Sequence, residues 1–123
     1  MAIQKDPTVN LIDEQSIAAG SSASSGWRDI SRVELETIVG KITNGATAPT
    51  VRPVFTVEVA SSGAGTDATE VYRALGGVTN DAVYPFRHHV DVTARFYRVT
   101  IDNTGESTQA ITGRAWANRV GAR

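Results

Sequence analysis

Hydrophobic and polar residues alternate along much of the chain, which is the pattern of half-buried β-strands. The alternation is clearest near the C-terminal end, in residues 94–101 (ARFYRVTI) and 110–120 (AITGRAWANRV). Between them lies the break Asn103-Thr104-Gly105, and Asn and Gly tolerate the positive φ of tight hairpin loops. We therefore predict a β-hairpin over Ala94–Val120.

The side chains of this predicted hairpin divide into two faces. A loop with an odd number of residues gathers the apolar set Tyr97, Val99, Ile101, Ile111, Gly113, Ala115 and Ala117 on one face, whereas an even loop would mix the sets. The other face then presents Phe96, Arg98, Arg114 and Trp116. Two arginines and two large aromatic residues are typical of a protein–protein contact core, so these four are candidate interface residues. The alternative is that Phe96 and Trp116 cap the domain's own core.

Further strands are predicted upstream of the hairpin. Strand-like patterns occupy residues 17–23, 32–43, 51–60, 68–75 and 83–92. Gly40 interrupts the first long strand and predicts a β-bulge there. Pro53 has no N–H for a ladder, which predicts an edge at that end of the next strand and makes Pro53 a further interface candidate. Trp27 is predicted to lie in the core or at a sheet corner.

The N-terminal segment Met1–Asp13 lacks periodicity and contains Asp6-Pro7, so we predict an extended arm. This divides the chain into an arm at residues 1–15 and a single β-sandwich domain at residues 16–123. Such termini become ordered when a neighbour holds them, which makes Asp6, Pro7, Val9 and Leu11 candidate contacts to a partner.

The fold class follows from the number and spacing of the predicted strands. About seven or eight strands, with no helical periodicity longer than two turns, predict an all-β, antiparallel β-sandwich. The jelly roll is the favoured eight-strand form, and a partly open barrel is the alternative. A chain of 123 residues is expected to form one domain.

Charge and composition remove several classes of partner. The chain has 12 basic and 13 acidic residues and a net charge of −1, which does not favour direct nucleic-acid binding or an anionic membrane surface. No apolar run has the length of a membrane span, and Met1–Asp13 lacks the features of a secretion signal. Only Lys5 and Lys41 among the basic residues are lysines, and an excess of arginine suits protein interfaces.

The sequence offers little for catalysis or metal binding, so we expect neither an enzyme nor a cofactor. There is no cysteine, and the only histidines, His88 and His89, are adjacent on a predicted strand and therefore point to opposite faces. Glu34 and Glu36 share one strand face, where a solvated surface is the preferred interpretation over a catalytic carboxylate pair. The segment Gly63-Ala64-Gly65 does not complete a phosphate-binding fingerprint, and the aspartates match no calcium-loop spacing.

Several short motifs together resemble a known group of proteins. They are Ser25–Ile30 (SGWRDI), Leu75–Val78 (LGGV), Tyr84–Phe86 (YPF), Arg95–Ile101 (RFYRVTI) and Asn103–Gly105 (NTG). In these the chain resembles the small all-β structural proteins of tailed-phage virions, most closely the jelly-roll head decoration, or cement, proteins. The resemblance implies a non-enzymatic virion protein on the capsid exterior, assembled in the host cytoplasm. It would bind the major capsid protein at subunit seams as a dimer or trimer and stabilise the shell.

Two other functions stay open from the sequence. A structural or carbohydrate-binding adhesin module of a tail or baseplate would use aromatic side chains such as Trp116 and Tyr97 to stack on sugars. A small enzyme would need a deep pocket that joins His88 or His89 to a carboxylate.

Overall fold

The computed structural model describes residues 5–122, which form nine β-strands and one short 3₁₀ turn. The strands are β1 (Lys5–Ile17), β2 (Ser22–Ser24), β3 (Arg28–Asp29), β4 (Val33–Asn44), β5 (Val54–Ala60), β6 (Thr69–Leu75), β7 (Val83–Val90), β8 (Phe96–Asp102) and β9 (Ile111–Ala122). The turn η1 (Val92–Ala94) links β7 to β8. All strand pairing is antiparallel.

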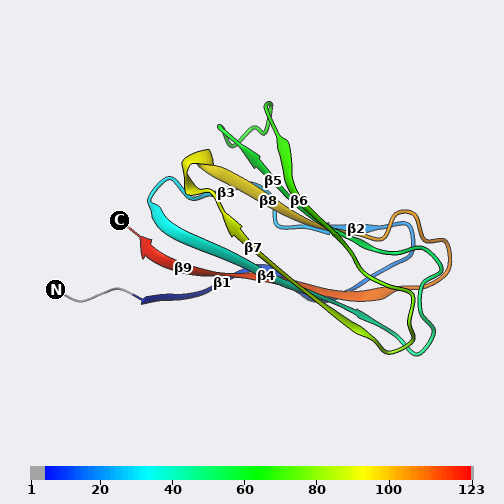
Figure 1. The fold of residues 1–123 in the computed structure, drawn as a ribbon. Coiled ribbons are helices and arrows are strands. Elements are labelled where there is room, and N and C mark those ends of the chain that lie inside the picture. The colour runs from blue at the N-terminus through cyan, green and yellow to red at the C-terminus, as the bar shows by residue number, and fades with distance from the viewer. Residues whose placement is uncertain (1–4, 123) are drawn as a thin grey trace.

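The strands form two sheets that pack face to face (Figure 1). The first sheet has the order β1-β9-β4-β7, and the second has the order β2-β8-β5-β6, with β3 also paired to β8. Within residues 5–122, β5 and β6 are the only consecutive strands that pair with each other, and the other connections between long strands cross from one sheet to the other. This strand order is that of a jelly roll, which confirms the predicted fold class.

The hairpin predicted over Ala94–Val120 is wrong. Strand β8 lies in the second sheet and β9 in the first, so the connection between them crosses the sandwich instead of turning back beside the same strand. The assignment of faces nevertheless holds, because Tyr97, Val99 and Ile101 are all buried in the core. They meet the inward face of β9 across the core: a Cβ added to Gly113 would lie 2.9 Å from Ile101 Cδ1.

The predicted N-terminal arm is also wrong for the residues that the structure describes. Strand β1 pairs with β9 along its whole length and so crosses the expected boundary at residue 15, and Leu11 and Ile12 are buried in the core. Three register shifts interrupt the ladder between β1 and β9. These irregularities break the alternation of polar and apolar residues, which is why the sequence pattern did not reveal a strand. Residues 1–4 lie outside the described part of the chain.

Gly40 does not form the predicted bulge, since β4 pairs with β7 and β9 without a register shift. Its side of β4 faces the aromatic centre of the core. There the Phe55 ring stacks on Phe86 at 4.8 Å and meets Tyr72 edge-on at 6.2 Å. A Cβ at Gly40 would lie 2.3 Å from Phe55 Cε2, so this position requires glycine for close packing.

Pro53 does not mark a sheet edge. It is buried just before β5, and β5 lies between β8 and β6 in the second sheet. The Pro53 carbonyl accepts a hydrogen bond from the Gly76 N–H at 2.8 Å. Pro53 therefore holds the start of the β6–β7 connection, and its burial removes it from the candidate surface residues.

Glu106 organises the end of the sandwich where the β4–β5 and β8–β9 connections meet. Its Oε1 accepts from the Thr50 N–H, the Thr50 hydroxyl and the Val51 N–H at 2.9, 2.9 and 3.0 Å. Its Oε2 accepts from the Thr108 hydroxyl and the Gln109 N–H, both at 3.0 Å. Desolvation alone would raise the pKa of Glu106, but these hydrogen bonds outweigh it and lower the pKa to about 2.

The low pKa of Glu106 makes stability depend on pH. Because the pKa in the folded chain lies below the unfolded value of 4.5, the carboxylate stabilises the fold above that pH and loses this contribution as the pH falls towards 2. We expect the loss of unfolding free energy in Glu106→Gln to be greatest above pH 4.5 and to shrink as the pH falls to about 2. Urea unfolding of both proteins across this range measures the difference, and a difference independent of pH would contradict the prediction.

The close contact between Gly40 and Phe55 predicts a second stability effect. Gly40→Ala should lower the free energy of unfolding by about 1–3 kcal/mol, because the new methyl group overlaps the Phe55 ring. Gly45→Ala is the matched control, since a Cβ at Gly45 meets no atom within 4 Å, and it should change stability by less than about 0.5 kcal/mol. Equal effects of the two substitutions in chemical denaturation would show that the close contact does not limit stability.

Candidate interaction surfaces

A buried ion pair joins β4 to β9 within the first sheet, at the end of the core nearest the described C-terminal residues. The Arg119 guanidinium donates from Nε to Glu36 Oε1 and from Nη2 to Oε2, both at 2.8 Å. The Tyr97 hydroxyl donates to Glu36 Oε2 at 2.7 Å from the opposite sheet. Glu36 and Tyr97 are completely buried, whereas 18% of the Arg119 side chain is exposed.

The surroundings of Tyr97 fix the direction of this hydrogen bond. Burial raises the pKa of Tyr97 well above its usual range, and the hydrogen bond to Glu36 raises it further. The phenol therefore stays protonated and acts as a donor. The interpretation of Glu36 as a solvated residue is wrong, although its position in phase with the inward-facing Ile38 and Ile42 was a signal for burial.

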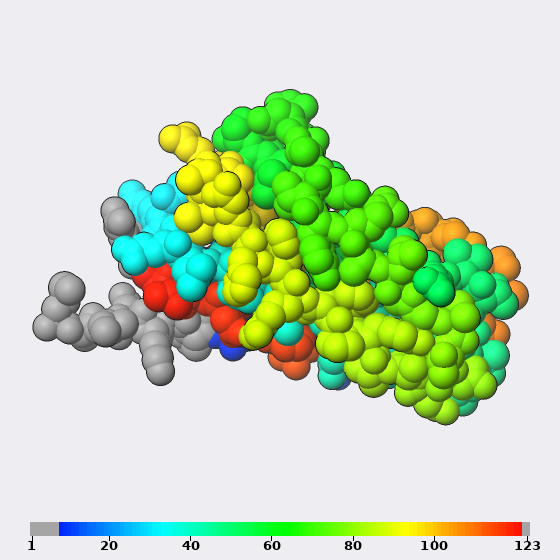
Figure 2. Space-filling model, in the orientation of Figure 1, coloured from blue at the N-terminus to red at the C-terminus, as the bar shows by residue number. Residues whose placement is uncertain are grey.

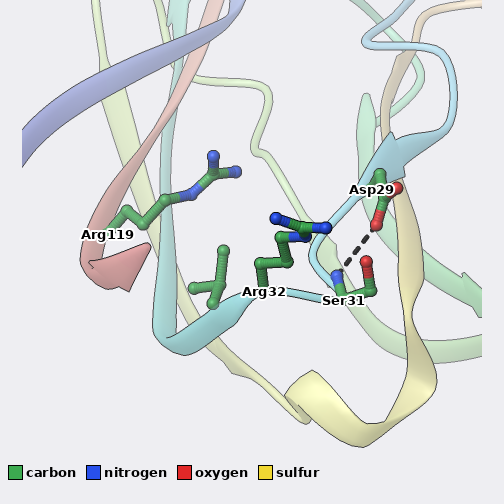
Figure 3. A pocket seen from close by; sticks show the side chains of 5 residues that line it. Asp29, Ser31, Arg32 and Arg119 are labelled. Atoms are coloured by element: carbon green, nitrogen blue, oxygen red, sulfur yellow. Dashed lines mark hydrogen bonds between the residues drawn. The ribbon is translucent and has the colours of Figure 1, made fainter. Parts of the chain in front are cut away.

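Arg119 also lines a small open pocket of about 220 Å³ (Figure 3). The other lining residues are Asp29, Ser31, Arg32 and Val33. Asp29 accepts the Ser31 N–H at 2.8 Å, and hydrogen bonds from Ser31, with a smaller effect of the Arg32 charge, lower the pKa of Asp29. Arg119 is already paired with Glu36, so the charged groups around the pocket are balanced.

The outer face of the second sheet forms a wide, shallow groove of about 430 Å³. Its walls are polar: Ser22, Ser24, Thr56, Glu58, Glu70, Arg73, Arg98, Thr100 and Asp102. Two ion pairs lie in it, Arg98–Glu58 at 2.6 Å and Arg73–Glu70 at 3.2 Å. The Arg98 guanidinium also lies over the Trp27 ring, 4.6 Å from its centroid. Trp27 is half-buried at the surface of this sheet, so of the two predicted positions, core or sheet corner, it does not occupy the core.

The outer face of the first sheet combines cations with apolar side chains. Arg114 lies over the Trp116 ring, 4.5 Å from its centroid. Val39 is opposite Trp116 on one side and Arg87 on the other, and Lys41 is opposite Arg114. Lys41 pairs with Glu14 of the edge strand β1 at 3.3 Å, and the side chains are 36% and 57% exposed.

The four residues predicted to share one contact face therefore lie on opposite sides of the sandwich. Phe96 and Arg98 belong to the outer face of the second sheet, and Arg114 and Trp116 to that of the first. Alternation correctly placed all four outside the core, but the wrong hairpin brought them together. Each arginine instead stacks on a tryptophan of its own face.

The remaining sequence candidates have less exposed positions than expected. Leu11 is buried in the core, Val9 packs against the core and is partly buried, and Pro53 is buried. The side chains of Asp6 and Pro7 lie outside the described residues, so their predicted contacts stay predictions.

The two histidines point to opposite faces, as the sequence predicted. His88 faces inward and stacks on Tyr72 with 4.9 Å between ring centroids. Burial lowers the pKa of His88, and the neighbouring charge of His89 lowers it further. His89 faces outward, with its Nδ1 2.9 Å from the Thr37 hydroxyl oxygen. In residues 5–122 no group of three His, Asp or Glu side chains could hold a metal ion.

The structure defines the chain as a jelly-roll sandwich with a polar groove on one outer face and cations beside apolar side chains on the other. Within the described residues, no helix has the length and apolar character needed to cross a membrane. No family model and no curated protein sequence matches the chain.

Solved structures share this fold over most of the chain. The PRD1 vertex protein P5 is 12% identical, and the match covers 96% of this chain and 99% of that one, with a TM-score of 0.59. The VP2 chain in the crystal structure of the infectious bursal disease virus VP2 subviral particle is 13% identical in sequence, with a TM-score of 0.53. That match covers 93% of this chain but only 32% of the VP2 chain. At these identities the likeness establishes a shared fold.

The buried ion pair predicts an order of stability losses. Glu36→Gln leaves the Arg119 charge partly buried without its counter-ion and should cost about 3–5 kcal/mol of unfolding free energy. Tyr97→Phe removes one hydrogen bond but keeps the ion pair, and it should cost about 1–2 kcal/mol. Urea denaturation at neutral pH compares the two variants. A Glu36→Gln protein at least as stable as Tyr97→Phe would contradict this account of the cluster.

Proposed function

We propose that this chain is a non-enzymatic structural protein of a virion. It binds the outside of a phage capsid at seams between major capsid protein subunits and stabilises the shell, as decoration or cement proteins do. The main support is the end-to-end likeness of its jelly roll to the PRD1 vertex protein P5, which matches nearly the whole of both chains. The partner is the major capsid protein, and the protein acts on the virion exterior after assembly in the host cytoplasm.

The physical character of the sandwich supports this proposal. Two sheets joined by the Tyr97–Glu36 hydrogen bond and by the stacking of Phe55 on Phe86 make a rigid body, as a clamp between subunits requires. The outer faces carry arginine–tryptophan stacks, and Arg and Trp are residues on which protein interfaces often depend. Many copies on one shell add avidity to a modest contact.

The end of the sandwich that carries the β4–β5 and β6–β7 connections is our candidate for the contact with the shell. Large apolar side chains are exposed there: Val51 at 46%, Val78 at 48% and Val83 at 55%. Leu75, at the end of β6 just before the second of these connections, is 49% exposed. Exposed apolar side chains gathered at one end of a domain mark a site of protein contact. Figure 2 shows the molecular surface in the orientation of Figure 1, with residues 76–84 spread over one end.

A tail or baseplate module that binds carbohydrate is the second candidate. The groove on the second sheet favours it, because the hydroxyls of Ser22, Ser24, Thr56 and Thr100 line a polar surface suited to sugar hydroxyls. The aromatic platform expected for sugar stacking is weaker than predicted, since Tyr97 is fully buried and Arg114 lies over Trp116.

Binding to shells tests the proposed function. The purified protein should sediment with capsids that lack it and should raise the temperature at which those capsids lose their contents. The double variant Val51→Asp/Val78→Asp should bind at least about tenfold more weakly, because it introduces charge into the apolar contact. Both positions lie in connections between strands, so the fold should persist by circular dichroism.

The control for this experiment is Arg52→Ala, an exposed position in the β4–β5 connection that keeps the valines intact. Failure of the wild-type protein to sediment with shells or to stabilise them would reject the decoration role. Binding to a glycan array in that case, reduced by Thr56→Ala and Thr100→Ala together, would favour the carbohydrate-binding alternative.

A further inference from the structure

The second-sheet groove has no cation free to bind an acidic ligand. Both of its arginines are in ion pairs, Arg98 with Glu58 and Arg73 with Glu70. The remaining charged residue, Asp102, is acidic and repels an anion. Hydroxyl groups line the rest of the groove: Ser22, Ser24, Thr56 and Thr100. Such a surface suits a neutral ligand that carries many hydroxyl groups.

One carboxylate oxygen in the groove is available to such a ligand. Arg98 donates from Nε and Nη2 to the same atom, Glu58 Oε1, at 3.1 and 2.6 Å. Within residues 5–122 no hydrogen bond uses Glu58 Oε2. This oxygen can therefore accept a hydroxyl that the ligand donates.

Trp27 lies beside the groove and supplies an aromatic ring. The Arg98 guanidinium, which lines the groove, lies 4.6 Å from the centroid of the Trp27 ring. Among the described residues Trp27 Nε1 has no hydrogen-bond acceptor, although an indole N–H usually finds one. A ring with a free N–H next to a polar groove can stack on the apolar face of a sugar and donate to one of its oxygens.

The β5–β6 connection (residues 61–68) covers part of the Trp27 ring. A Cβ added to Gly65 would lie 2.4 Å from Trp27 Nε1, so the backbone of the connection lies directly against the ring. Every hydrogen bond of residues 62–66 in the structure stays within the connection. The connection is therefore held on the ring by van der Waals contact, and it can move away without breaking a hydrogen bond to either sheet.

We propose that Trp27 and the second-sheet groove form a binding site for a neutral oligosaccharide, and that the sugar displaces the β5–β6 connection from the Trp27 ring. The ring stacks on one sugar unit, and its N–H donates to a sugar oxygen. The hydroxyls of the groove and Glu58 Oε2 bind the hydroxyls of the neighbouring units.

This inference rests on the carbohydrate-binding candidate for the groove and is independent of the exposed valines proposed to contact the shell. The general candidate and the role of Trp27 can fail separately. If Thr56→Ala/Thr100→Ala weakens sugar binding and Trp27→Ala does not, the groove candidate stands and the inference is overturned.

A glycan array that carries neutral and acidic oligosaccharides tests the site, and calorimetry with the best neutral oligosaccharide gives the affinity. We expect Trp27→Ala to weaken binding at least about tenfold, because the stacking surface and the N–H donor are lost. Trp116→Ala is the matched control, since it removes the other tryptophan, which also stacks with an arginine but on the opposite sheet. It should leave the affinity unchanged. Array binding to no glycan, or to acidic glycans alone, would overturn the inference.

Fluorescence provides a second readout, which does not require the Trp27→Ala protein to fold. The chain has two tryptophans, so Trp27 is the only one in Trp116→Phe. The neutral oligosaccharide should change the Trp27 emission of this protein at the same concentrations at which calorimetry shows binding. Binding without any change in emission would place the sugar away from Trp27.

The covering connection is tested in the same Trp116→Phe protein. Gly65→Ala should push the connection off the ring, which makes Trp27 easier to quench with acrylamide and tightens sugar binding about threefold or more, since the cover no longer has to be displaced. Gly20→Ala is the control. Both glycines have a positive φ, +68° and +77°, but a Cβ at Gly20 meets no atom within 4 Å. Equal quenching and equal affinity in the two variants would show that the connection does not cover the site.

Discussion

The buried contact of Glu36 with Arg119 and Tyr97 is the constraint on which the rest of the structure depends. Two charge-assisted hydrogen bonds join β4 to β9 within the first sheet, and one phenolic hydrogen bond joins β4 to β8 of the second sheet. A buried charge is tolerated only when its partners keep good geometry, so this contact fixes how the two sheets lie on each other. The outer faces of the two sheets, which are our candidate interaction surfaces, therefore keep a fixed position relative to each other.

The sequence predicted which side chains face the core more reliably than which strands pair. Tyr97, Val99 and Ile101 are buried as expected, because alternation is a local property of a strand. Pairing depends on where the chain goes after each strand. The Asn103-Thr104-Gly105 break looks like a hairpin turn, yet Glu106 ties the connection that follows it to the β4–β5 connection, and the chain crosses to the other sheet.

The sequence predicted the candidate interaction surfaces only in part, because facing is a local property and strand pairing is not. Arg98 and Trp116 are outward-facing as expected, but no local pattern could tell that they lie on opposite sheets. The stacking of Arg98 on Trp27 joins residues far apart in the sequence and gave no signal. Glu36 did give a signal for burial, since it is in phase with buried isoleucines. A carboxylate is seldom buried without a partner, however, and its partner Arg119 is distant along the chain.

The position of β9 between β1 and β4 has a consequence for how the molecule forms. Strands β1 and β4 are synthesised early, but neither can complete its ladder until β9, the most C-terminal described strand, has been made and inserted between them. The first sheet therefore cannot close on a partly synthesised chain, and pairing between such distant segments makes folding slow. The outer face of the first sheet exists only once that strand is in place, so incomplete chains lack this candidate interaction surface.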